Sequence, residues 1–579
     1  MACCVASLLL VRDWLAECAT AVIQKIPVVL DMAESTLSDS CWNQPPILSI
    51  GERRAGVRDT RPTEFDKGVL DAKTFDAIET DPLFDSINHT VTHAGQSVLY
   101  RSLSRPAPNP ALVQEKQEAL RELKSNSGLR EALQHFIEAM VPGERSLYQL
   151  LYGTFTGGIA IDNSRGGKDE MEFSGYGYHQ FIDGTDFAVD LVETVRTLPQ
   201  PQSTYLRSLF DAIIDFGNSR TYALMRGPIY LVEGKFKTRE EKPRYLPVAR
   251  FTPSMIKPLP IVLMVAIVGA ILYFFQNMLA SFGISYLGYG ILVLAVPVVP
   301  VLLIAIAASD RDSVIYPLRK LFRQSPDLAR ALDILGMIDE ILSFHRYSLA
   351  FGGKMVLPEI VEGEQHSLSV NEARNPLLAR THPDYVPNDI LLDDAGRLLV
   401  ITGPNSGGKT AYCKTVAQIQ LLGQIGCYVP ATAAHMVLAE RIFYQVPEPG
   451  RLDEGMGRFG QELKRTREIF FNSTARSLVV LDELSEGTTF EEKMELSEYV
   501  LAGFYKLGAS TLLVTHNHEL CERLQEKGIG RYLQGEFLPH GPTYRLIPGV
   551  SRVSHADRVA AALGFSKEDV EKHLATRRT

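Results

Sequence analysis

The sequence lacks the cysteine spacing that zinc sites and disulfide frameworks require. Its seven cysteines form no C-x-x-C pair, and a chain of 579 residues can bury a core without cross-links. An excess of basic charge is also missing, because the formal net charge is −9 at pH 7. This balance excludes a protein that coats nucleic acid with a uniformly basic surface, although a local basic groove is still allowed. From the composition we expect a globular protein. Because the cysteines show no disulfide framework, we expect its soluble parts to face a reducing cytoplasm.

Charged residues are absent from one long stretch, residues 258–309. Two apolar runs within it, 259–275 and 287–308, approach or exceed the length of about 20 residues that a helix needs to cross a bilayer. Basic residues flank both outer ends, a distribution that favours the cytoplasmic side. We therefore predict a two-helix transmembrane hairpin in the lipid bilayer, with an inner-membrane location and both termini in the cytoplasm. The alternative is a pair of long core helices in a soluble protein.

A glycine-rich loop of the form G-x-x-x-x-G-K-T follows a short apolar strand at residues 397–402. The loop consists of Gly403, Pro404, Asn405, Ser406, Gly407, Gly408, Lys409 and Thr410. In a loop of this kind the backbone N–H groups wrap the phosphates of ATP. Lys409 would reach the β- and γ-phosphates, and Thr410 would supply a hydroxyl to Mg²⁺. The pattern taken alone also fits a chance glycine loop with a solvated lysine.

Two further strand patterns end in side chains that suit the same chemistry. Residues 477–481 form an apolar run that is followed by Asp482 and Glu483. One carboxylate would help to hold Mg²⁺, and the next would polarise the attacking water. Residues 510–515 form another such run and deliver His516, which can contact a γ-phosphate. The acids could instead cap a helix and the histidine could be structural, but the joint order and spacing favour a nucleotide site.

Three runs, 401–431, 478–489 and 512–520, resemble the ATPase domain of the MutS family of DNA mismatch-repair proteins. The resemblance implies an ABC-type ATPase that works as a dimer with composite sites and uses ATP and Mg²⁺. It also implies that Thr410 and Asp482 hold the metal, and that Glu483 and His516 are the catalytic residues. Upstream, residues 374–390 resemble the segment in which an aromatic ring stacks on adenine. Tyr385 takes that place here, and the alternative is a tyrosine packed in the core.

The sequence departs from the family in the signature that lies between the two nucleotide motifs. The family carries Gly-x-Ser-Thr-Phe before a glutamate, whereas this sequence has Gly-Met-Gly-Arg-Phe at residues 455–459 and then Glu462. Gly457 and Arg458 replace the hydroxyl residues that would face the nucleotide of the partner subunit. We therefore expect weak turnover. Arg458 either contacts the γ-phosphate of that nucleotide or is a solvated loop residue.

The resemblance extends upstream, because residues 70–80 and 85–106 are similar to the start of the MutS core domain. The expected fold is an α/β P-loop (ABC-type) ATPase domain plus an all-α MutS core/lever-like domain that the transmembrane hairpin interrupts. We predict an N-terminal extension (1–63), a helical core (64–257), the hairpin (258–309), a returning helical part (310–360) and the ATPase domain with C-terminal helices (361–579). The N-terminal extension is too short for the mismatch-recognition and connector domains of the family.

Two functions fit this organisation. The first is a membrane-anchored, MutS-like ATPase that acts as a homodimer and binds duplex DNA in an ATP-dependent manner. The second is an ATP-driven membrane mechanical or signalling module that does not bind DNA. Similarity to the MutS core favours the first function, and the acidic balance of the chain favours the second.

Overall fold

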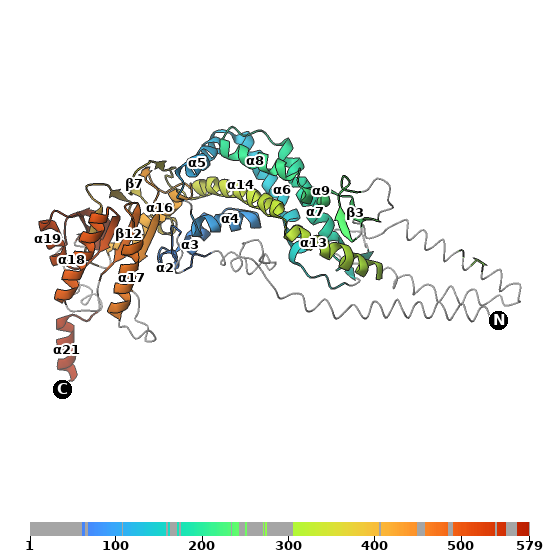
Figure 1. Cartoon of the computed structure of the whole chain (residues 1–579). Helices are drawn as coiled ribbons and strands as arrows, with labels where there is room; N and C mark the ends of the chain where they lie inside the picture. Colours follow the sequence, from blue (N-terminus) through green and yellow to red (C-terminus); the bar gives the residue numbers. More distant parts are fainter. Residues whose placement is uncertain are drawn as a thin grey trace. The chain divides into compact units, whose positions relative to one another are not determined.

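The computed structural model describes residues 61–63, 68–106, 108–157, 160–161, 171–172, 175–232, 234–242, 249–251, 270, 273–274, 305–404, 407–447, 458–484, 490–538, 541–551 and 564–577 (Figure 1). Helices dominate the first part of this range, up to residue 350. Sheets covered by helices make up the part that follows.

Capping residues fix where several helices of the first part begin. Its helices are α2 (Ala72–Ala77), α3 (Thr80–Ile87), α4 (His93–Ser104), α5 (Pro110–Ser125), α6 (Ser127–Tyr152), α7 (Tyr178–Thr197), α8 (Thr204–Phe216), α9 (Arg220–Arg226), the π-helix η3 (Arg311–Ile315), α13 (Tyr316–Arg323) and α14 (Pro326–Ala350). Asn109, Asn126 and Ser325 each accept a backbone N–H in the first turn of the helix that follows them. Proline opens α5 and α14, where a missing N–H costs no hydrogen bond.

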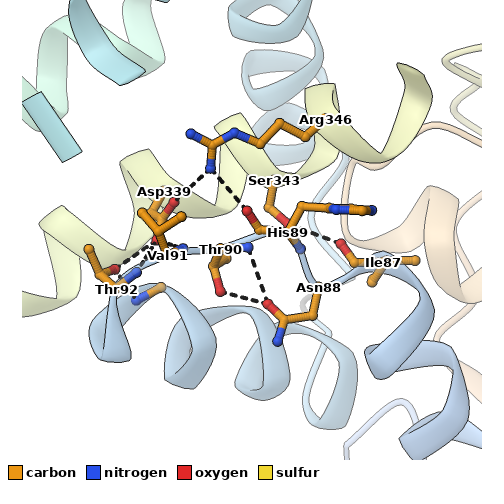
Figure 2. Close-up of polar contacts among 10 residues, drawn as sticks. Ile87, Asn88, His89, Thr90, Val91, Thr92, Asp339, Ser343 and Arg346 are labelled. Carbon is orange, nitrogen blue, oxygen red and sulfur yellow. Dashed lines mark hydrogen bonds and ion pairs between the residues drawn. The ribbon is translucent and has the colours of Figure 1, made fainter. Parts of the chain in front are cut away.

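The α4 and α14 helices cross at very short range. A Cβ atom on Gly336 would lie 2.5 Å from the carbonyl oxygen of Ala94, and one on Gly95 would lie 2.3 Å from Oδ2 of Asp339. Only glycine allows this approach. The loop between α3 and α4 also lies along α14. It lies next to Asp339, Ser343 and Arg346 of that helix (Figure 2).

Hydrogen bonds tie this loop to α14. Asp339 Oδ2 accepts the backbone N–H groups of Val91 and Thr92, both at 2.9 Å, and the Thr92 hydroxyl at 2.8 Å (Figure 2). Ser343 accepts the N–H of His89 at 2.9 Å and donates to the carbonyl of Ile87 at 3.0 Å. A loop without regular structure is thereby fixed through its backbone groups.

The expectation that the helical part is all-α is wrong, because it also contains short strands. A two-stranded sheet pairs β1 (Ala160–Ile161) with β2 (Met171–Glu172), and a three-stranded sheet has the order β4 (Lys235–Lys237), β3 (Ile229–Val232) and β5 (Ala249–Phe251). The β-branched and aromatic residues of β3 favour a strand. Gly234, with φ of 74°, supplies the turn into β4.

The second part is built on two sheets. A four-stranded sheet has the order β6 (Glu359–Ile360), β10 (Ala433–Met436), β7 (Leu368–Ala373) and β8 (Asn388–Leu392). A six-stranded sheet has the order β11 (Arg441–Gln445), β12 (Ser477–Asp482), β13 (Ser510–Val514), β9 (Leu398–Thr402), β14 (Arg531–Leu538) and β15 (Gly541–Pro548). All neighbours in the larger sheet are parallel except β14 and β15, which form an antiparallel hairpin.

The central strands of the larger sheet are buried on both faces, as expected when helices cover a parallel sheet. The helices of this part are α15 (Leu378–Thr381), α16 (Lys409–Gln424), α17 (Arg458–Asn472), α18 (Phe490–Leu507), α19 (His518–Glu526) and α21 (Lys567–Arg577) (Figure 1). The core of the sheet includes Val479, Leu481, Leu513 and Phe504. Because β9, β12 and β13 run parallel, the side chains at their carboxyl ends share one edge.

The structure corrects the predicted transmembrane hairpin, its bilayer partner and the inner-membrane location. Within the described ranges, no helix is both long enough and apolar enough to cross a bilayer. The two longest helices there, α6 with 26 residues and α14 with 25, carry charged residues along their length and bury their apolar side chains. Most of residues 258–309 lie outside the described residues. The fold class is therefore mixed α/β, and the membrane part of the expectation is wrong.

Candidate active site

The phosphate loop joins the central strand β9 to the helix α16. Gly403, with φ of 123°, and Gly408, with φ of 80°, adopt backbone conformations that favour glycine. Gly408 is also the N-cap of α16, and among the described residues no side chain caps that helix end. The N–H groups of the first turn can therefore donate to an anion that lies at this helix N-terminus. Asn405 and Ser406 lie outside the described residues.

Lys409 is folded onto the loop that precedes it. Its Nζ donates to the carbonyl of Gly403 at 2.6 Å and to that of Pro404 at 2.8 Å. Burial lowers the pKa of Lys409 to about 8, although the charge of Asp482 opposes this shift. A desolvated ammonium of this kind gains from a phosphate oxygen that neutralises it.

Thr410 and Asp482 meet at the edge of the sheet. The Thr410 hydroxyl donates to Oδ2 of Asp482 at 3.2 Å, across 72 residues of sequence. Burial raises the pKa of Asp482, and the bond from Thr410 acts in the opposite direction. A hydroxyl beside a carboxylate is an oxygen donor set that suits Mg²⁺. Among the described residues no group of three or more His, Cys, Asp or Glu could hold a metal, so phosphate and water oxygens would complete the coordination of the ion.

Glu483 is held in a strained conformation beside His516. Its φ of 63° is uncommon for a residue other than glycine, and its N–H donates to the carbonyl of Val514 at 3.0 Å. Oε1 of Glu483 lies 3.3 Å from Nε2 of His516, whose side chain is 43% exposed. Such strain persists only where the surrounding structure enforces it, and it often marks a functional site. The neighbouring strands β12 and β13 thus bring Glu483 and His516 together.

Tyr385 lies beside α16 rather than free above the loop. Its side chain is half-buried, and Thr415 of α16 is among its polar neighbours. Burial raises the pKa of Tyr385. Asn375 donates to the same Thr415 hydroxyl at 3.0 Å and to the Gln418 side chain at 3.0 Å. The tyrosine is therefore partly buried, and only its exposed surface can meet a ligand.

Sequence reasoning missed two aromatic residues of the β14–β15 hairpin. Gln534 of β14 pairs with Thr402, the last residue of β9, so the hairpin continues past the sheet edge beside the phosphate loop. A Cβ on Gly407 would lie 3.2 Å from the Phe537 ring, and one on Gly408 would lie 3.5 Å from the Tyr544 ring. The signal that could have found them is the presence of aromatic residues in the hairpin sequence that follows the strand before His516.

The N-cap residues of α2 and α3 join the two helices that flank the site. Arg465 of α17 and Asp71, the N-cap of α2, form a buried ion pair at 2.7 Å. Lys414 of α16 pairs with Glu79 at 2.7 Å. The helix that follows the phosphate loop and the helix that follows the signature are thus linked through the start of the helical part.

The signature region is only partly described. Residues 448–457, including Gly457, and the side chain of Arg458 lie outside the described residues. The backbone of Arg458 begins α17, and Glu462 is buried in the next turn of that helix. The role of Arg458 therefore stays a prediction.

Comparisons with known proteins find similarity in the part of the chain that contains this site. Residues 399–533 match the family model described as MutS domain V. The chain is 36% identical over 208 residues to a DNA mismatch repair protein MutS of Chlorobium chlorochromatii, a match that covers 34% of this chain and 23% of that protein. It is 32% identical over 230 residues to a DNA mismatch repair protein MSH3 of Kluyveromyces lactis, covering 38% and 22%.

A third relative extends the matched region slightly. The chain is 33% identical over 262 residues to a DNA mismatch repair protein MutS of Anaeromyxobacter dehalogenans, which covers 42% of this chain and 29% of that protein. The matches to these three relatives thus span between 22% and 29% of the relatives' length. They support a relation to the MutS family for the part of the chain that carries the phosphate loop.

Proposed function

We propose that this chain is a MutS-type ATPase that binds ATP with Mg²⁺ and hydrolyses it. The observation that carries the proposal is the meeting of the Thr410 hydroxyl with Asp482 at 3.2 Å, directly after a glycine loop and beside Glu483. The similarity of residues 399–533 to MutS domain V supports the same reading.

Each residue then has a distinct task. The N–H groups at the start of α16 bind phosphate oxygens, and Lys409 exchanges its two carbonyl acceptors for β- and γ-phosphate oxygens. Thr410 and Asp482 would hold Mg²⁺, which neutralises phosphate charge when it is bound. Glu483 orients and polarises the attacking water, and His516 contacts the γ-phosphate from the neighbouring strand. Tyr385 supports the nucleotide from the side of α16.

The proposal also covers the partners of this chain. We propose a homodimer with composite sites and binding to duplex DNA, supported by relatives that are named DNA mismatch repair proteins. In such a dimer Arg458 would contact the γ-phosphate bound by the partner subunit. Its guanidinium would replace the hydroxyl groups of the usual signature.

Replacement of Lys409 tests the proposal. Lys409→Ala should weaken binding of ATP with Mg²⁺ by about 100-fold or more, because the phosphate charge would lose its buried cation. Calorimetric titration of the full chain measures this loss. The matched control is Lys506→Ala, which removes an exposed lysine of α18 and should leave affinity within about threefold. Undiminished binding by Lys409→Ala would overturn the assignment of the phosphate loop.

A further inference from the structure

Three basic residues lie on α13 (Tyr316–Arg323). They are Arg319, Lys320 and Arg323. Within the part of the chain that the structure describes, no Asp or Glu forms an ion pair with any of them. Arg311, just before this helix, differs because it pairs with Asp312 at 2.7 Å. In a chain with a net charge of −9, such an uncompensated group produces a local positive potential.

Aromatic rings and a carbonyl hold the two arginines in place. The guanidinium carbon of Arg319 lies 4.6 Å from the ring centroid of Tyr316, and Nη1 donates to the carbonyl of Gly153. The guanidinium carbon of Arg323 lies 5.1 Å from the ring centroid of Tyr152. These contacts use the ring faces and leave other guanidinium N–H donors for a ligand. Because the side chains are already ordered, binding an anion costs little further conformational entropy.

The surroundings of Arg319 favour an anion. Burial is the main cause that lowers the pKa of Arg319, and the neighbouring charge of Arg323 lowers it further. Two cations that lie close together and are partly removed from water repel each other. An anion that contacts both would relieve this repulsion.

We propose that Arg319, Lys320 and Arg323 form a contact surface for the phosphate backbone of duplex DNA. This inference rests on the proposed DNA binding and assigns residues to it. Arginine binds phosphate through two parallel N–H···O bonds, and lysine binds it as a point charge. Residues three or four positions apart on a helix lie about 5–6 Å apart at Cβ, so the cations form a short row. A row suits a chain of phosphates better than a single phosphate group.

Contacts to the phosphate backbone predict a specific salt dependence. Each phosphate that a cation neutralises adds about 0.9 to the slope of log affinity against log salt concentration. The variant Arg319→Gln/Lys320→Gln/Arg323→Gln should therefore reduce the slope by roughly 2 to 3. Its affinity at about 100 mM salt should fall by about tenfold or more, with no change in sequence preference.

The experiment measures anisotropy of a labelled duplex of mixed sequence with the full chain between about 50 and 300 mM salt. The matched control is Arg121→Gln/Lys124→Gln/Lys354→Gln, which removes three exposed cations elsewhere. This control should keep the slope of the parent protein within about 1. A reduced slope in the α13 variant alone supports the proposed surface.

Other outcomes overturn it in distinguishable ways. A parent protein that binds no duplex at the lowest salt removes both the proposed DNA binding and this surface, whereas ATP binding would stand. An unchanged slope in the α13 variant, with binding by the parent, removes only the surface. Loss of binding to phosphatidylserine vesicles without loss of DNA binding would assign the row to lipid phosphates instead. Should the triple variant fail to fold by circular dichroism, Lys320→Glu at this exposed position must still reduce the slope by about 1.

Discussion

Two helix N-termini in this molecule present the same backbone donors and use them in opposite ways. At α4, Asp339 accepts the N–H groups of Val91 and Thr92, and Glu144 accepts those of His93 and Ala94 at 2.9 and 2.8 Å. At α16 the N-cap is Gly408, and no side chain in the described part of the chain caps the helix. The first helix end is closed by carboxylates of its own chain, whereas the described side chains leave the donors of the second open.

The comparison separates a helix end that carboxylates of the chain close from one that stays open. Carboxylates from α6 and α14 lock α4 into a joint of three helices, and the short contacts of Gly95 and Gly336 leave that joint no room to shift. The α16 end instead gathers a strained Glu483, a desolvated Lys409 and an exposed His516. Changes at the first end should therefore alter stability, and changes at the second should alter chemistry.

The largest expected loss of stability follows from Asp339→Ala. A buried N–H group, a partly buried N–H group and the Thr92 hydroxyl would lose their acceptor, which should lower the free energy of unfolding by about 4 kcal/mol. Asp339→Asn keeps an acceptor oxygen and should cost about 1 kcal/mol. Urea unfolding measures both, with the exposed Asp327→Ala of the same helix as control. A loss in Asp339→Ala no larger than in this control would show that α4 does not need its carboxylate.

Glu483→Gln, at the site beside the N-terminus of α16, should change ATP hydrolysis rather than the free energy of unfolding. Hydrolysis should fall by about 100- to 1000-fold, because the amide cannot polarise water, while ATP affinity stays within about threefold. Steady-state phosphate release and nucleotide titration separate these two quantities. Glu491→Gln, an exposed change nearby in sequence, is the control. Equal turnover in Glu483→Gln and the parent would mean that another group activates the water.

The sequence predicted which side chains meet at the open end of α16 better than it predicted the contacts at the closed end of α4. Lys409, Thr410, Asp482, Glu483 and His516 each follow an apolar strand pattern, and parallel strands bring their carboxyl ends to one edge. The structure places the Thr410 hydroxyl on Asp482 and Glu483 beside His516, as that reasoning requires. A local pattern is enough here because the motif and its strand are continuous in sequence.

The rest depends on contacts between distant residues. Nothing local marks Asp339 as the partner of Thr92, 247 positions away, or Tyr544 as a neighbour of Gly408. The predicted membrane hairpin relied on apolar length and missing charge, and flanking basic residues set its predicted orientation. Neither quantity says which surface covers an apolar segment, and the long helices that the structure describes bury theirs in protein.

The charge on Glu144 gives a pH test of the closed end. Burial raises the pKa of Glu144 to about 7 from its usual value of 4.5, despite the two N–H donors of α4. Between these values the folded protein holds a proton that the unfolded chain has lost, so stability should decline as pH rises from about 4.5 to about 7. The decline should total roughly 3 kcal/mol and then level off.

Urea unfolding across this pH range measures the decline, and Glu144→Gln should remove this contribution. A parent profile as flat as that of the variant would contradict the prediction. It would mean that the α4 donors keep Glu144 ionised, so that both helix ends in the comparison would bind a full negative charge.

The smallest expected effect concerns Tyr544, which lies beside the open end of α16. Its φ of 61° is a conformation that costs a residue other than glycine about 1 kcal/mol. Asn388 fixes this backbone by donating to the Tyr544 carbonyl at 2.9 Å and accepting the Leu546 N–H at 2.8 Å. Tyr544→Gly should therefore be more stable than Tyr544→Ala by about 1 kcal/mol, because both lose the ring and only glycine relieves the strain.

The same pair of variants tests whether the ring serves the open helix end. If the Tyr544 ring near Gly408 contacts bound nucleotide, Tyr544→Gly and Tyr544→Ala should both lose about three- to tenfold in ATP affinity, whereas Tyr544→Phe should keep it. Tripolyphosphate, which lacks ribose and base, should bind all of these variants as it binds the parent. An equal loss for tripolyphosphate would show that the ring acts only by shaping the phosphate loop. Unchanged ATP affinity in the glycine variant would leave Tyr544 as a strained cover of the loop, and the open end of α16 would then bind through its backbone and Lys409 alone.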